Sequence, residues 1–125
     1  IKDNHLAAIG GADRIARAVA AARAFAPHTL RIEVEVTSLE ELDQALAAGA
    51  DVILLDNMPI DMMAEAVRRT AGRAILEASG GITLETVRQV AETGVDLISS
   101  GALTHSAPAL DISLEIELQP EEDAP

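Results

Sequence analysis

The segment AAGADVILLDN, from Ala47 to Asn57, decides the fold class because its pattern recurs twice further along the chain. The later copies are TAGRAILEASG, from Thr70 to Gly80, and ETGVDLISSGA, from Glu92 to Ala102. Each copy is typical of a helix end, a glycine, a short apolar strand and a polar loop. The copies are 23 and 22 residues apart, measured between Gly49, Gly72 and Gly94. Leucine-rich solenoids have repeats of similar length, but their LxxLxL pattern is absent from this sequence. Strands that alternate with helices predict βαβ units and a parallel sheet.

The segments between these repeats extend the same alternation. We predict helices over residues 12–26, 38–48, 60–70 and 83–93, and strands over residues 30–36, 51–55, 73–78, 95–99 and 111–118. Ser38 and Glu41 have the spacing of a capping box, and Thr83 is a candidate N-cap. Residues 1–118 then form one domain unit with four to five parallel strands, and the acidic, proline-bounded residues 119–125 are expected to be a disordered tail.

The strand IEVEV, from Ile32 to Val36, favours a (β/α) barrel or part of one over a doubly wound sheet. Side chains alternate along a strand, so Glu33 and Glu35 face away from the apolar set. A doubly wound sheet has helices on both faces, where two buried acids are very costly. The inner face of a barrel is polar near the C-terminal rim of its strands. The expected fold is therefore α/β, a partial TIM-like barrel.

Composition excludes several functional classes. The 125 residues are 49% hydrophobic and carry a formal charge of −12, and Phe25 is the single aromatic residue. Such a chain repels nucleic acids and anionic membranes and lacks the rings that stack on bases. It has no cysteine and no run of about 18 apolar residues. With no signal peptide visible either, we expect a cytoplasmic protein.

Polar residues recur at the expected strand ends with nearly the same period as the repeat. Glu35, Asp56, Glu77 and Ser99 are 21 or 22 residues apart, which predicts one common level around the C-terminal rim. Active sites of barrels lie at this rim, and two or three carboxylates there suit a divalent metal or sugar hydroxyls. The plainer interpretation is that Asp56 only begins a turn and that Glu35 is solvated.

Two small-residue loops follow successive strands, SGG at Ser79–Gly81 and SSGA at Ser99–Ala102. Backbone amides in such loops approach phosphate oxygens closely, although ordinary turns look alike. For Asn57 the simpler interpretation is a turn residue that bonds to the backbone. For His105 it is a structural or exposed histidine outside any site. Among the cations, only Lys2 is expected near the strand ends. The arginines fall on helices or at strand beginnings: Arg14, Arg17, Arg23, Arg31, Arg68, Arg69, Arg73 and Arg88.

Five motifs in fixed order carry a family resemblance: IKDNH, IEVEV, LLDNM, EASGGI and ISSGALTH. Together they resemble the C-terminal part of the quinolinate phosphoribosyltransferases, also called carboxylating nicotinate-nucleotide pyrophosphorylases. The resemblance extends from Ile1 to about Ile116. It implies an enzyme of NAD biosynthesis, a pentosyltransferase that converts quinolinate and phosphoribosyl pyrophosphate (PRPP) to nicotinate mononucleotide, pyrophosphate and CO2 with Mg²⁺. It also implies an N-terminal sandwich domain before the barrel, and homodimers or larger assemblies.

The resemblance also implies roles for particular residues. Lys2 would contact an anionic substrate group, while the catalytic Glu35 and Asp56 would hold the ribose hydroxyls and Mg²⁺, directly or through water. Glu33 matches the motif as well as Glu35 does, and the spacing favours Glu35. The 5-phosphate would bind Ser79, Gly80, Gly81, Ser100, Gly101 and Ala102. Further candidates without an assigned role are Asn4, His5, Asn57 and His105.

The family's cation-rich quinolinate site and its sandwich domain are missing from this sequence. We therefore expect a fragment of a longer enzyme that is inactive alone and that associates through exposed apolar surface. Alternative hypotheses are another phosphate-handling barrel, such as an isomerase or a synthase, and a relative encoded with molybdenum transport. A third is a non-catalytic subunit or binding module.

Overall fold

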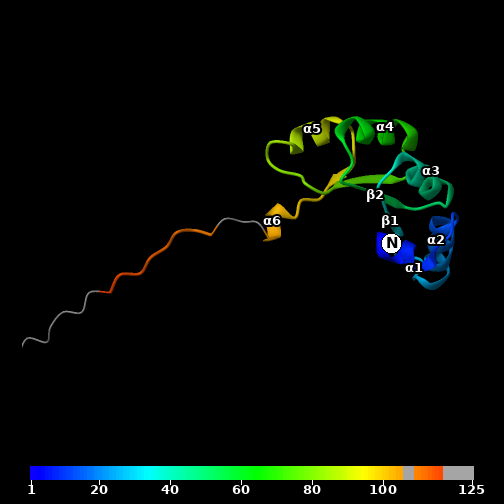
Figure 1. The fold of residues 1–125 in the computed structure, drawn as a ribbon, viewed down its shortest axis with the longest axis horizontal. Coiled ribbons are helices and arrows are strands. Elements are labelled where there is room, and N and C mark those ends of the chain that lie inside the picture. Colours follow the sequence, from blue (N-terminus) through cyan, green and yellow to red (C-terminus); the bar gives the residue numbers. More distant parts are fainter. Residues whose placement is uncertain (106–108, 117–125) are drawn as a thin grey trace, which may run out of the picture.

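Four parallel strands form one sheet in the order β1-β2-β3-β4 in the computed structural model, which describes residues 1–105 and 109–116. The strands are β1 (Glu33–Val36), β2 (Val52–Asp56), β3 (Ile75–Ser79) and β4 (Leu97–Ile98). The helices are α1 (Asp3–Ile9), α2 (Arg14–Phe25), α3 (Leu39–Ala47), α4 (Ile60–Thr70), α5 (Val87–Glu92) and α6 (Ala102–His105). Figure 1 shows α3, α4 and α5 side by side along the sheet, with α1 and α2 beside the β1 edge.

One face of the sheet is packed under helices, and the other carries the acids. Val34, Val36, Ile53 and Leu55 are fully buried on the helix side and continue into the core with Leu76 and Ala78. Glu33 and Glu35 lie on the opposite face and are only partly buried, as strand alternation predicts. Parallel strands with helices on one side form part of a (β/α) barrel, so the predicted fold class is confirmed.

Local signals located the first three long helices well. The predicted N-cap of α3 is present, because Ser38 Oγ accepts a hydrogen bond from Glu41 N at 3.2 Å. The second half of the capping box is displaced by one residue. Glu41 Oε2 accepts from the backbone N of Thr37 at 3.0 Å and from Thr37 Oγ1 at 3.1 Å, rather than from Ser38 N.

One predicted helix begins later than expected, and another helix was not predicted at all. Helix α5 begins at Val87, and its N-cap is Thr86 rather than Thr83. The Thr86 hydroxyl accepts a hydrogen bond from Thr83 N at 3.0 Å, which closes a turn where the helix was expected to start. Helix α1 was not predicted. It begins after Lys2, whose backbone N–H donates to His5 Nδ1 at 3.0 Å.

The strand predicted over residues 111–118 is wrong for its described part. Residues 109–116 have no regular secondary structure and lead away from the sheet (Figure 1). Their apolar side chains are exposed: Leu110, Ile112, Leu114 and Ile116. A strand needs a neighbouring strand for its backbone hydrogen bonds, and the described part of the chain places none beside this segment. Residues 117–118 and the predicted acidic tail, 119–125, lie outside the described residues.

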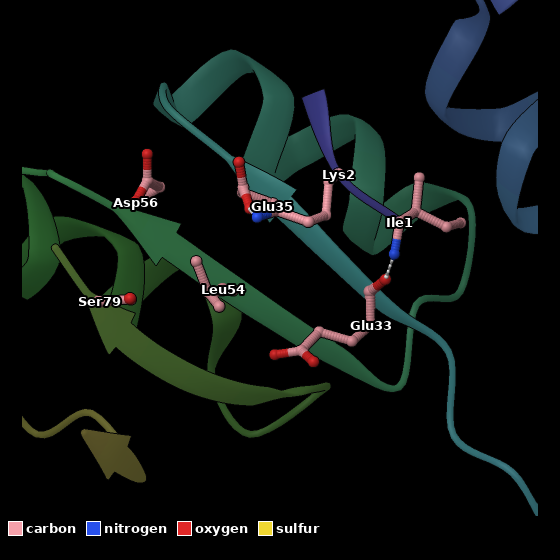
Figure 2. Close-up of a pocket in the computed structure, with 7 residues that line it drawn as sticks. All are labelled: Ile1, Lys2, Glu33, Glu35, Leu54, Asp56 and Ser79. Carbon is pink, nitrogen blue, oxygen red and sulfur yellow. Dashed lines mark hydrogen bonds and ion pairs between the residues drawn. The ribbon is translucent and has the colours of Figure 1, made fainter. Parts of the chain in front are cut away.

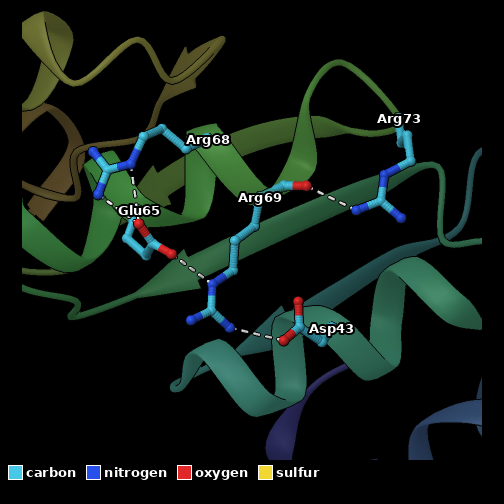
Figure 3. A network of polar contacts seen from close by, with 5 residues as sticks. All are labelled: Asp43, Glu65, Arg68, Arg69 and Arg73. Atoms are coloured by element: carbon cyan, nitrogen blue, oxygen red, sulfur yellow. Dashed lines mark hydrogen bonds and ion pairs between the residues drawn. The ribbon is translucent and has the colours of Figure 1, made fainter.

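Arginines on the outer helices are held by ion pairs far from the acidic face (Figure 3). Arg69 joins two helices, with 2.8 Å to Asp43 Oδ2 on α3 and 2.8 Å to Glu65 Oε1 on its own helix. Arg68 also pairs with Glu65, and Arg73 donates to the carbonyl of Arg69 at 2.7 Å. These basic side chains are therefore engaged on the outer surface, as their sequence positions predicted.

Candidate functional site

A pocket of about 270 Å³ opens at the C-terminal ends of β1 and β2. Figure 2 shows the residues that line it: Ile1, Lys2, Glu33, Glu35, Leu54, Asp56 and Ser79. Four of them were predicted as site residues, namely Lys2, Glu35, Asp56 and Ser79. They come from the start of the chain and from three different strands, so the fold brings together residues that are far apart in the sequence.

The strand register places the acids in two rows rather than at one level. Glu35 pairs with Leu54, which in turn pairs with Glu77, so these three side chains form one row across the sheet. Asp56 pairs with Ser79 one row closer to the rim. The even sequence spacing therefore did not give the correct relative level of Asp56. Glu77 lies one row deeper, where its carboxylate accepts a hydrogen bond from the Ser99 hydroxyl.

Lys2 is held at the pocket by backbone pairing of its neighbour with β1. The Ile1 amino group donates to Glu33 O at 2.5 Å, and Glu35 N donates to Ile1 O at 2.9 Å, which is a parallel bridge. This pairing places Lys2 Nζ 3.6 Å from Glu35 Oε2. The lysine side chain is 66% exposed and the glutamate 15% exposed, so the cation lies on the open side of the pair.

Asp56 ends β2, and the next residue turns the chain out of the sheet. Asn57 has a φ of 52°, which Asn tolerates better than most residues. Its backbone N–H donates to Ser79 O at 2.9 Å, and its side-chain Nδ2 donates to Asp56 Oδ2 at 3.0 Å. The carboxylate of Asp56 is thus held beside the end of β3, at the rim of the pocket.

The two glycine loops lie on neighbouring strands and are joined by a hydrogen bond. Ser100 Oγ donates to the carbonyl of Ile82 at 2.9 Å, directly after Ser79–Gly81. His105 packs against the second loop, because a Cβ built on Gly101 would lie 2.6 Å from its Nε2 atom. Beside these loops lies an apolar groove of about 340 Å³, lined by Ile82, Thr83, Leu84, Val87, Ser100, Ala102 and Leu103.

Two further candidates have local structural roles in α1 instead of lining the pocket. His5 accepts the Lys2 N–H and caps the helix, while the backbone of Asn4 bonds to Asp3 Oδ1 at 2.7 Å. Neither residue lines the pocket that contains Lys2.

Arg14 is a rim residue that the sequence analysis missed. It begins α2, and Nη2 lies 2.7 Å from Glu41 Oε1. Both residues line a second pocket of about 200 Å³ that shares Glu35 with the first. The expectation that Lys2 alone among the cations lies near the strand ends is wrong. Helices of βαβ units run antiparallel to the strands, so a first helical residue lies at the C-terminal rim; that was the usable signal.

Burial and hydrogen bonding shift the pKa of two glutamates near the pockets in opposite directions. Burial, with the nearby Glu77 carboxylate, raises the pKa of Glu33, and the N-terminal ammonium opposes this only in part. Burial would also raise the pKa of Glu41, but hydrogen bonds from Thr37 and Arg14 outweigh it and hold that pKa below its usual range. Glu33, at the start of β1, therefore keeps its proton to higher pH than an ordinary glutamate, and Glu41 loses its proton at lower pH.

The carboxylates of Glu35 and Asp56 suit Mg²⁺ as part of a coordination shell, not as a complete one. Among residues 1–105 and 109–116, no three acidic or histidine side chains gather as a complete metal cage. Glu35 and Asp56 nevertheless open onto the same pocket, with their carboxylates toward its rim (Figure 2). Mg²⁺ is commonly bound through one or two carboxylates, water and substrate oxygens. The two residues fit that mode.

In the described part of the chain, every helix is too short or too polar to cross a membrane.

Comparison with known proteins gives consistent matches over nearly the whole chain. The family described as quinolinate phosphoribosyl transferase, C-terminal domain, matches residues 1–115. A nicotinate-nucleotide pyrophosphorylase (carboxylating) of Mycobacterium leprae is 50% identical over 119 residues, which cover 93% of this chain and 40% of that protein. Its counterpart from Homo sapiens is 45% identical over 119 residues, covering 93% and 39%.

Solved structures show the same similarity. The structure of NadC from Streptococcus pyogenes is 44% identical and superposes with a TM-score of 0.78. The match covers 92% of this chain and 39% of the other. The chain thus spans about two fifths of the length of the curated relatives that it matches.

Proposed function

The chain belongs to the quinolinate phosphoribosyl transferase family, in the part that forms its C-terminal domain, and on this premise we propose that it binds the phosphoribosyl group in that reaction. The reaction transfers phosphoribose from PRPP to quinolinate and releases pyrophosphate and CO2, giving nicotinate mononucleotide. The observation that carries the proposal is the meeting of Lys2, Glu35, Asp56 and Ser79 around one pocket.

Glu35 and Asp56 have the chemistry that this transfer needs. As pyrophosphate leaves, positive charge develops on the ribose ring, as in glycosyl transfer through an oxocarbenium-like state. Two carboxylates accept hydrogen bonds from the ribose hydroxyls and stabilise that charge at a fixed place. Mg²⁺, when bound, neutralises charge on the pyrophosphate. No covalent nucleophile is required, and none of the pocket residues is a cysteine.

The two glycine loops suit the 5-phosphate. Positive φ angles at Gly80 and Gly81 turn the backbone sharply just beyond β3, and consecutive amides in such turns form anion-binding concavities. Ser100–Ala102 follows the neighbouring strand, with His105 packed against Gly101. We assign the phosphate to the space between these loops, next to the ribose at Asp56.

Quinolinate is a dianion, and this chain offers it few cations. Lys2 is largely exposed at the pocket, whereas Arg14 is engaged by Glu41. A dicarboxylate needs several basic groups in a chain with a formal charge of −12. We assign the remaining cations to parts of the enzyme that this chain does not span, in the same or a partner subunit of a homodimer or larger assembly.

We also propose a cytoplasmic location.

Calorimetric titration of this chain tests the assignment. PRPP with Mg²⁺ is expected to bind, and Asp56→Asn is expected to weaken binding about tenfold or more, because a hydrogen bond to a charged group is lost. Asp43→Asn, on the outer surface of α3 where the carboxylate pairs with Arg69, is the matched control and should bind normally. Equal PRPP affinity in Asp56→Asn and the control would contradict the assignment. Quinolinate-dependent pyrophosphate release is expected only when the full-length enzyme is assayed.

A further inference from the structure

Asn57 links two separate parts of the pocket rim. Its side-chain Nδ2 donates to Asp56 Oδ2 at 3.0 Å, and its backbone N–H donates to Ser79 O at 2.9 Å. Asp56 ends β2 and Ser79 ends β3, and Figure 2 shows these two residues at the ends of neighbouring strands, so Asn57 bonds to both strands at the point where they leave the sheet. One residue therefore contacts both the carboxylate and the first residue of the glycine loop.

The amide of Asn57 also lies directly against Gly80. A Cβ built on Gly80 would lie 2.5 Å from Asn57 Cγ and 2.8 Å from its Nδ2. Real side chains do not tolerate such distances, so the Asn57 amide requires glycine at position 80. Gly81 differs: its φ is +61°, but a Cβ there meets no atom within 4 Å. Gly80 is needed for space and for backbone conformation, whereas Gly81 is needed for conformation alone.

We propose that Asn57 is a positioning residue that sets the separation between the Asp56 carboxylate and the Ser79–Gly81 loop. The inference rests on the proposed function in one respect. If Asp56 holds the ribose and the loop holds the 5-phosphate, then Asn57 determines the distance between these two subsites. A ribose 5-phosphate unit has a nearly fixed length, so a small change in this distance weakens both contacts together.

The chemistry of position 57 explains why asparagine suits this role. The left-handed φ disfavours most side chains, whereas Asn and Gly adopt it readily. An aspartate would place a second carboxylate against Asp56. Asn57→Gly therefore removes the amide while it preserves the backbone, which makes it the cleanest probe of the contact.

A double-mutant cycle tests the contact with Gly80. Unfolding by urea is compared for Gly80→Ala, Gly81→Ala, Asn57→Gly and the two double variants. We expect Asn57→Gly to reverse part of the effect of Gly80→Ala, with a coupling of about tenfold in the unfolding equilibrium constant. Gly81→Ala, which has strain without a clash, should combine additively with Asn57→Gly. Additive behaviour in both pairs would overturn the inference.

A second measurement separates positioning from stability alone. Titration with ribose 5-phosphate is expected to show about tenfold weaker binding by Asn57→Gly, because the separation between the Asp56 carboxylate and the loop is no longer held. Gly49→Ala is the control, because its φ of +75° brings strain with no neighbour within 4 Å and far from the rim. Unchanged affinity in Asn57→Gly would contradict positioning even if the cycle shows coupling.

Nuclear magnetic resonance keeps the test independent of the ligand. In Asn57→Gly, the Asp56 carboxyl ¹³C signal and the backbone amide signals of Ser79–Gly81 are expected to shift together, and in Gly49→Ala they should not. If the wild-type chain binds no ribose 5-phosphate, the proposed function fails for this chain, and these shifts still decide the inference. Unmoved signals at Asp56 or at the loop would overturn it.

Discussion

Lys2 and Glu35 form an ion pair at the mouth of the rim pocket, with 3.6 Å between Nζ and Oε2. The two residues are 33 positions apart along the chain, and the parallel bridge between Ile1 and β1 brings them together. The pair places a cation beside the carboxylate that we assign to ribose. An anionic substrate can therefore contact Lys2 while its sugar contacts Glu35.

Lys2→Gln is expected to affect binding much more than stability. The lysine is mostly exposed, so the free energy of unfolding should change by less than about 1 kcal/mol. Affinity for PRPP should fall about tenfold, because a charge-assisted hydrogen bond is lost. Urea unfolding and calorimetric titration measure the two effects. Lys2→Arg retains the charge and should keep most of the affinity; equal losses in both variants would argue against a charge role.

Glu33 is expected to destabilise the fold as the pH rises. Burial, together with Glu77, raises its pKa above the usual 4.5, so the folded state holds this proton more tightly than the unfolded chain. The stabilising contribution is complete below pH 4.5 and is lost as the pH rises through the folded-state pKa. Glu33→Gln should therefore be more stable than wild type at pH 7, and the difference should vanish toward pH 4. Urea midpoints between pH 4 and 8 check this; a Glu33→Gln variant that is less stable at pH 7 would contradict it.

Glu41 is expected to have the opposite pH dependence. Burial works against its charge, but hydrogen bonds from Thr37 and Arg14 lower its pKa below 4.5. Its contribution is present above pH 4.5 and is lost as the pH falls through the folded-state pKa. Glu41→Gln should cost about 1–3 kcal/mol at pH 7, because it weakens bonds to a partly buried charge. Wild type should lose this advantage in acid, and identical unfolding curves at pH 7 would refute the role.

Self-association is expected to depend on the segment 109–116. Four apolar side chains there are 73–84% exposed and alternate with polar residues: Leu110, Ile112, Leu114 and Ile116. Exposed apolar segments with this alternation associate with the unpaired sheet edges of other copies. Sedimentation velocity should therefore show oligomers that dissociate in the double variant Ile112→Ser and Leu114→Ser. A wild-type chain that remains monomeric at all concentrations would refute the prediction.

The residue placements that the sequence predicted correctly depend on local geometry. Glu33 and Glu35 face away from Val34 and Val36 because side chains alternate along any strand. Ser38 caps α3 because the N–H it accepts lies only three residues ahead. Polar residues just after apolar strands lead to the C-terminal rim in any parallel sheet, which explains why Asp56 and Ser79 were identified.

The failures lie where a particular contact, local or tertiary, outweighs the general preference of a residue. Thr83 was predicted to begin a helix, but the Thr86 hydroxyl accepts its N–H and closes a turn instead. Residues 111–116 alternate like a strand, yet a strand also requires a partner that the described residues do not provide. Arg14 was placed on a helix and not expected near the strand ends, whereas the packing of α2 against α3 brings it to Glu41 at the rim.

The sequence by itself determined the alternation of helices and strands, the inward direction of the acids, and the family. These depend on residue types a few positions apart, and on motifs in a fixed order. Only the tertiary structure decided that Asp56 pairs with Ser79 while Glu35 shares a row with Glu77. It also decided that the Asn57 amide lies against Gly80. Strand register depends on backbone hydrogen bonds between segments about 20 residues apart, and equal sequence spacing does not specify it.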